Sequence, residues 1–232
     1  MEQMVVSLLP VFMILVVGML IRRLNLLSHE VISGLKTIII KIALPGVLFM
    51  AFAQSEMGLD NLYIFILVFV FCVLLYMIGG LLHHALPKLF PFEYTNGYFT
   101  GFEFGMIGIG LFTAIWGMDK LPIIAVIAFG HEIFIWFVYV PILEARRTGH
   151  VNIPQILKDF IKTPTIIGIL LGIVVNVFGL YDLMKDYTVG LGVLNALTML
   201  GNAIAPLILI IIGYAMTFRS IPVKKSLVLL IS

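Results

Sequence analysis

Long apolar stretches dominate the chain and alternate with short polar connections. Seven of them have about the twenty residues that an α-helix needs to cross the hydrocarbon core of a bilayer. They are residues 4–21, 32–53, 62–82, 97–117, 121–143, 164–180 and 193–218, and an eighth begins at Ser226 and is cut off at Ser232. The pattern predicts an all-α polytopic membrane protein.

A repeat of proline and glycine positions, here called the sequence echo, runs through these stretches. Pro10 and Gly18 in the first recur as Pro164 and Gly172 in the sixth, and the Ala-Leu-Pro that ends at Pro45 in the second recurs as Ala-Pro in the seventh. If the unit has five spans, its second copy enters the membrane from the opposite side, which is the inverted repeat of a secondary transporter.

This echo predicts three parts. Residues 1–146 form a first five-span repeat, 147–163 a cytoplasmic connector, and 164–232 a second, truncated repeat with spans six, seven and the start of eight. Under this scheme the chain is either a fragment or borrows the missing spans from a partner.

Composition supports a membrane protein and sets its orientation. The chain is 62% hydrophobic and 11% charged with a mean hydropathy of +1.17, too few charges for a water-facing surface. Alternate connections and adjoining span ends hold twelve of the fourteen Lys and Arg residues, and the others hold only Lys120 and Lys185. The positive-inside rule therefore places the N-terminus outside a cell (inner) membrane. The net charge of +2 reflects this asymmetry and does not indicate a nucleic-acid partner.

The fourth stretch has an unusual density of glycine. Five glycines fall within residues 97–110, among them Gly105, Gly108 and Gly110, and such a segment forms a poor helix. One interpretation is a broken helix whose free backbone donors bind an anion inside the membrane. The other is a packing ridge of glycines spaced by four. Both stay open.

Two acids and a histidine lie within the predicted fourth and fifth spans. Glu103 lies in the glycine-rich stretch, and His131 and Glu132 lie near the middle of the fifth span. Intramembrane acids are functional candidates, so these residues are candidates for coupling transport to H+ or Na+. The alternatives are that Glu103 reaches interfacial water and that His131 and Glu132 form a structural hydrogen-bonded pair.

Enzymatic and metal chemistry are not predicted. His131-Glu132 does not complete a zinc-protease motif, because Ile135 stands where the second histidine is required. The single Cys72 excludes a disulfide within one chain. With neither a nucleophile constellation nor a phosphate-binding loop, we expect no enzyme, no cofactor and transport driven by a gradient.

Lys41, Pro45 and Asn202 complete the set of candidate binding residues. Pro45 in the second span and Pro206 in the seventh each remove a helical hydrogen bond and free a carbonyl four residues back. Lys41 either meets an acid or an anionic substrate, or snorkels to the cytoplasmic surface. Asn202 is too short to snorkel, so its amide is expected to face a polar interior.

In their order these motifs resemble the auxin efflux carrier family, which is related to the bile acid sodium symporters. The resemblance covers nearly the whole chain and rests on residues 33–49, the glycine-rich stretch, 163–172 and 201–213. It implies a ten-span fold of two inverted five-span repeats, broken spans four and nine, and a homodimer. It further implies small organic anions as substrates, either auxin-like molecules or dicarboxylates, and the short connector is similar to that of bacterial and archaeal members.

The chain departs from the family pattern at two positions of the broken span. Glu103 and Gly110 stand where the family usually has asparagine and proline, and an ionised Glu103 would repel an anion. We therefore expect either proton coupling or a different substrate. The main hypothesis is an organic-anion carrier that works by alternating access. The alternative is a non-transporting membrane scaffold or ligand sensor with the same fold.

Overall fold

The computed structural model describes residues 2–55, 58–90, 95–102 and 108–216, and within these every regular element is helical. The elements, including π-helical turns η1 and η4 and the 3-10 turn η3, are α1 (Glu2–Arg23), α2 (His29–Ile38), η1 (Ile39–Ala43), α3 (Leu44–Gln54), α4 (Leu59–Ala85), α5 (Thr95–Thr100), α6 (Ile109–Trp116), η3 (Met118–Lys120), α7 (Leu121–Phe134), η4 (Ile135–Tyr139), α8 (Val140–Thr148), α9 (Ile153–Lys162), α10 (Pro164–Val177), α11 (Leu180–Asp186) and α12 (Thr188–Ala215).

Four helical segments are long and apolar enough to cross a membrane: His29–Gln54, Leu59–Ala85, Met118–Thr148 and Thr188–Ala215. A fifth is added if α9 and α10, which are bent by 74° at their junction, count as one broken span. The described residues thus confirm the all-helical prediction, and by length and composition four or five segments could cross a membrane in a multi-pass protein.

Two of the predicted stretches differ from single spans. The fourth is divided, because α5 ends at Thr100, Gly101 and Phe102 lie in no regular element, and α6 begins only at Ile109. The sixth is the 14-residue α10, shorter than the roughly twenty residues that a span requires. It ends where Gly179 adopts a left-handed conformation with φ 64°.

Two spans widen into a π-turn just before a proline. Turn η1 precedes Pro45 and turn η4 precedes Pro141, each with one residue between. Proline cannot donate the usual backbone hydrogen bond, and in η1 the N–H of Leu44 instead donates to the carbonyl of Ile39, five residues back. Such wide turns inside α-helices occur frequently at functional sites.

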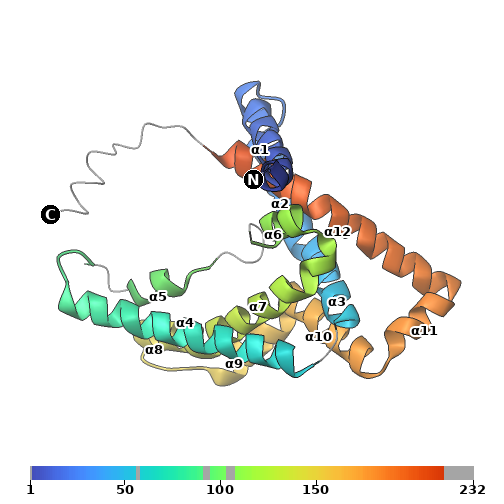
Figure 1. Cartoon of the computed structure of the whole chain (residues 1–232). Helices are drawn as coiled ribbons and strands as arrows, with labels where there is room; N and C mark the ends of the chain where they lie inside the picture. Colours follow the sequence, from blue (N-terminus) through green and yellow to red (C-terminus); the bar gives the residue numbers. More distant parts are fainter. Residues whose placement is uncertain (1, 56–57, 91–94, 103–107, 217–232) are drawn as a thin grey trace.

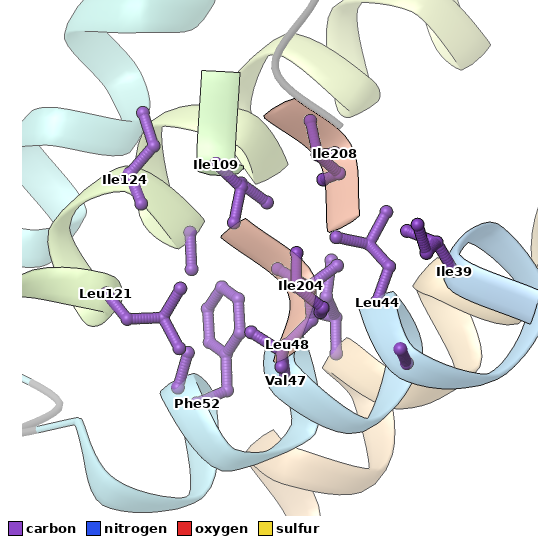
Figure 2. Packing of buried hydrophobic residues seen from close by; sticks show 14 of the residues in the cluster. Ile39, Leu44, Val47, Leu48, Phe52, Ile109, Leu121, Ile124, Ile204 and Ile208 are labelled. Atoms are coloured by element: carbon purple, nitrogen blue, oxygen red, sulfur yellow. The ribbon is translucent and has the colours of Figure 1, made fainter. Parts of the chain in front are cut away.

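The two halves of the divided stretch pack on different parts of the molecule. Helix α5 packs on α4, whereas α6 packs on α1, α7 and α12 (Figure 1). The buried core lies beside α6, where Ile109 faces Leu48 of α3 and Ile204 of α12 (Figure 2).

Helix α1 crosses α12 at a pair of glycines. A Cβ atom built on Gly18 would meet the carbonyl oxygen of Ile210, the Cα of Gly213 and the amide nitrogen of Tyr214. Beyond the crossing, Arg22 Nη1 donates hydrogen bonds to the carbonyls of Tyr214 (2.9 Å) and Ala215 (3.4 Å) at the end of α12. The two backbones therefore approach where only glycine fits.

Helix α10 crosses α3 in the same manner. A Cβ atom on Gly172 would meet the carbonyl oxygen of Phe49, the Cβ of Phe52 and the amide nitrogen of Ala53. Beyond this crossing, Asn176 Nδ2 lies 3.1 Å from the carbonyl oxygens of both Phe52 and Ala53 and 2.6 Å from that of Ser55. One amide group thus holds the C-terminal end of α3.

Candidate functional site

Two cavities flank the crossing of α3 and α12. The first, of about 240 Å³, lies between α3, the N-terminal end of α7 and α12. Its lining combines apolar side chains with four polar residues, Gln54, Asp119, Thr198 and Asn202. The structure thus places Asn202 at a cavity with other polar groups.

Charge determines what this polar cavity can hold. Asp119 contributes a carboxylate whose oxygen lies 3.6 Å from Lys120 Nζ, and the hydroxyl of Thr198 donates to the carbonyl of Leu194 at 2.9 Å. Gln54 and Asn202 add amides that can both donate and accept. Because Asp119 is exposed and paired with Lys120, the amides and the hydroxyl dominate the cavity, which therefore suits a polar neutral group.

The second cavity, of about 430 Å³, lies between α3, α10 and α12. Its walls are apolar apart from Lys41, and they include Pro45, Gly46, Pro164 and Gly168. An ammonium group at the edge of an apolar cavity can hold a carboxylate that carries an apolar body, since it supplies charge-assisted hydrogen bonds. Lys41 and Pro45, two of the predicted binding residues, therefore lie together.

Leu197 separates the two cavities and lines both. A Cβ atom on Gly46 would lie 2.8 Å from Leu197 Cδ2, and a Cβ atom on Gly201 would lie 3.0 Å from Val47 Cγ2. These glycines let α3 and α12 approach closely between the cavities. Asn202 and Lys41, predicted to share one pocket, consequently lie on opposite sides of this crossing.

His131 binds the C-terminal end of α5, the first half of the divided stretch. The side chain is 6% exposed, and its Nε2 donates a hydrogen bond of 2.8 Å to the carbonyl of Thr100, the last residue of α5. Its ring also meets Phe102 edge-on, with the centroids 5.7 Å apart. Terminal helical carbonyls lack a partner within their helix, so His131 supplies one where α5 stops. Its neighbour Glu132 is half-buried.

The glycines of the fourth stretch occupy separate environments. Gly97 faces Tyr139, and Gly110 of α6 is buried, with its Cβ position 3.0 Å from Ile208 Cγ2. Gly108 precedes α6 and is half-buried. Gly97 and Gly110 therefore act in close helix packing. Glu103 and Gly105 lie outside the described residues.

Sequence reasoning did not single out several polar residues at these sites. Gln54 and Asp119 lie near span ends, where polar side chains are ordinary, and Thr198 lies inside α12 with its hydroxyl bonded to the carbonyl of Leu194. Asn176 carries a stronger signal, because it follows Pro164 at the spacing by which Arg22 follows Pro10. Among the described residues, no group of three or more His, Cys, Asp or Glu side chains could hold a metal ion.

No family model matches the chain, and a comparison with the curated proteins finds no match either.

Proposed function

We propose that the chain is built from inverted repeats and functions as a secondary transporter of a small organic anion. The proposal depends above all on the agreement between the two glycine crossings. Gly18 and Gly172 are equivalent in the sequence echo at a spacing of 154 residues, as are Pro10 and Pro164. The echo of Pro45 in Pro206 sets a second spacing, 161 residues, for the partner helices.

The contacts follow both spacings residue by residue. Adding 161 to Phe49, Phe52 and Ala53, which surround Gly172, yields Ile210, Gly213 and Tyr214, which surround Gly18. The carbonyl oxygen of Phe49 corresponds to that of Ile210, and the amide nitrogen of Ala53 corresponds to that of Tyr214.

The polar contacts obey the same spacings. Arg22 and Asn176 are 154 residues apart, and the carbonyls of Tyr214 and Ala53 that they bind are 161 apart. Exchanging α1 with α10 and α3 with α12 relates the contacting residue pairs of one crossing to those of the other. A pseudo-twofold between two inverted repeats performs this exchange and is the organisation expected of an alternating-access carrier.

The Lys41 cavity is the proposed anion site. It places one ammonium group beside an apolar wall, directly at π-turn η1 and Pro45. Auxin-like molecules combine a carboxylate with an apolar ring, and this composition favours them over dicarboxylates. Asn202 and the polar cavity lie across the α3–α12 crossing, where relative motion of the helices would open one side and close the other.

The remaining parts of the proposal follow the family resemblance. They are membership in the auxin efflux carrier family, a homodimer in a cell (inner) membrane with the N-terminus outside, and coupling to H+ or Na+ through Glu103, His131 and Glu132. The divided fourth stretch supports a broken crossover helix. The bond from His131 to Thr100 assigns His131 first to holding the end of α5.

Proteoliposomes loaded with the protein test this function. Uptake of labelled indole-acetate and of malate is measured with and without a pH or Na+ gradient, and saturable, gradient-driven uptake is expected. Lys41→Gln should weaken the apparent affinity about tenfold by removing a charge-assisted hydrogen bond. Lys36→Gln, which changes the same charge outside the cavity, is the matched control. Glu103→Gln should abolish the effect of the gradient.

Two outcomes would contradict the proposal. Binding of the labelled anion without flux would favour the scaffold or ligand sensor. An unchanged affinity in Lys41→Gln would exclude the α3–α10–α12 cavity as the anion site.

A further inference from the structure

The connector helix α9 combines a buried and an exposed apolar edge. Ile156 and Phe160 are buried, and the Phe160 ring packs edge-on against Trp136 (centroids 6.0 Å apart) and Phe137 (5.1 Å) of η4. These contacts fix the rotation of α9 about its axis. The fold therefore determines which other residues of α9 are exposed.

A second apolar row lies next to the buried one and stays uncovered. Ile153, Leu157 and Ile161 are 51%, 40% and 56% exposed. Residues spaced by four lie above one another on one helical face, so the three form a single stripe along the whole of α9. Water would surround this stripe if α9 projected into the cytoplasm, which is costly for three large apolar side chains.

Basic side chains border the exposed stripe. Lys158 and Lys162 follow Leu157 and Ile161 by one residue each, and both are exposed. Asp159, three residues before Lys162, accepts a hydrogen bond of 2.8 Å from Gln155 Nε2. Long lysine side chains beside an apolar face can extend to headgroups while their stems stay in the interface.

The direction of α9 suits a position along the membrane surface. Helices α9 and α10 meet at Thr163 with a bend of 74°. A helix that turns this far from a span lies near the plane of the bilayer when the span is steep. Residues 144–162 include four Lys or Arg residues and two acidic residues, so the connector is net basic.

We propose that α9 is an interfacial helix that binds acidic phospholipid headgroups on its side of the membrane. Ile153, Leu157 and Ile161 enter the boundary between headgroups and acyl chains, and Lys158 and Lys162 bind the phosphate and carboxylate groups of the acidic lipids. Amphipathic helices with this arrangement bind anionic membranes through combined apolar burial and charge. The proposal requires a membrane-embedded chain but does not depend on transport.

Fluorescence quenching by spin-labelled lipids tests the site. The intact chain, with buried Cys72 replaced by Ala, carries an environment-sensitive fluorophore at Leu157→Cys or, as a control, at Gln155→Cys on the polar face. Each protein is placed in phosphatidylcholine nanodiscs that contain spin-labelled phosphatidylcholine or spin-labelled phosphatidylserine. The Leu157 position should be quenched several-fold more than the Gln155 position, and more strongly by the phosphatidylserine probe.

Lysine variants then measure how much the charges of α9 contribute to the preference for acidic lipid. Lys158→Gln and Lys162→Gln should each lower the preference for phosphatidylserine about fivefold, the factor that corresponds to one basic residue near an anionic surface. Lys88→Gln, an exposed lysine outside α9, should leave it unchanged, and Lys162→Arg should retain it. Thermal unfolding of each variant confirms that the fold persists.

Equal quenching at positions 157 and 155 would overturn the interfacial placement. Equal quenching by the two lipids, or an equal effect of Lys162→Gln and Lys88→Gln, would overturn the recognition of acidic headgroups.

Discussion

The two glycine crossings share one design and differ in detail. In each, a glycine of the shorter helix rests on the backbone of the longer segment, and a polar side chain one turn further holds its terminal carbonyls. Helix α10 has a second glycine, Gly168, seated on the backbone of Pro45, whereas the equivalent residue of α1 is Ile14. The second close glycine of the α1–α12 crossing lies instead on α12, where a Cβ atom on Gly213 would meet the carbonyl oxygen of Leu15.

This difference places the specialised crossing beside the proposed anion site. Pro45 and Gly168 both line the Lys41 cavity, so the additional glycine brings α10 against the proline and lets both helices form one wall. The α1–α12 crossing retains the shared packing and uses the guanidinium of Arg22, which also lies 5.7 Å from the Tyr214 ring. Equivalent scaffolds can thus carry different chemistry.

The largest expected effects come from filling the two glycine contacts. Gly18→Leu and Gly172→Leu should each lower the free energy of unfolding by about 3 kcal/mol or more, because the new side chain meets backbone atoms that cannot rotate away. Reversible unfolding in mixed detergent micelles measures the change. Gly192→Leu is the control, since a Cβ there meets nothing within 4 Å. A large loss of stability at only one crossing would show that the two crossings are not equivalent.

The additional glycine of α10 should be the next most sensitive. Gly168→Ala places a methyl group against the carbonyl oxygen and Cα of Pro45, and we expect a loss of about 2 kcal/mol for backbone overpacking. The same micelle titration applies, with Gly192→Ala as the matched control. If Gly168→Ala proved neutral, the close wall between α3 and α10 would not exist.

The two polar side chains should differ according to their burial. Asn176 is half-buried and Arg22 exposed, so water can replace Arg22 more easily. Asn176→Leu should cost about 1.5 kcal/mol and Arg22→Leu about 0.5 kcal/mol, the range for lost hydrogen bonds to partly buried carbonyls. Asn195→Leu, at an exposed position of α12, controls for the added apolar surface. The opposite order would show that the Arg22 contacts with Tyr214 matter more than burial.

The sequence predicted where the long helices lie but not which of them cross. The predicted stretches 32–53, 62–82 and 121–143 fall within helical segments of the structure, because twenty consecutive apolar residues leave few alternatives to a span. Which faces meet depends on backbone approach at Gly18 and Gly172, and uniformly apolar helices carry no polar face from which to infer it.

The structure brings the predicted site residues together only in part, for the same reason. Lys41 and Pro45 stood out as a charge and a helix breaker inside a span, and the structure brings them to one cavity. Asn202 stood out as a short amide, yet it lines the other cavity beside Asp119. Their separation arises from the α3–α12 packing at Gly46 and Leu197, a long-range contact that no local pattern encodes.

Gly46 offers the finest test, because its predicted effect on stability is the smallest. A methyl group there meets only the flexible end of Leu197, so Gly46→Ala should change the free energy of unfolding by less than about 0.5 kcal/mol, unlike Gly168→Ala. Leu197 lines both cavities, and displacing it narrows the space on at least one side of α3. Stability should therefore hold while uptake of the larger indole-acetate falls more than that of malate. Equal losses of uptake for the two anions would show that the α3–α12 contact does not determine which substrate is transported.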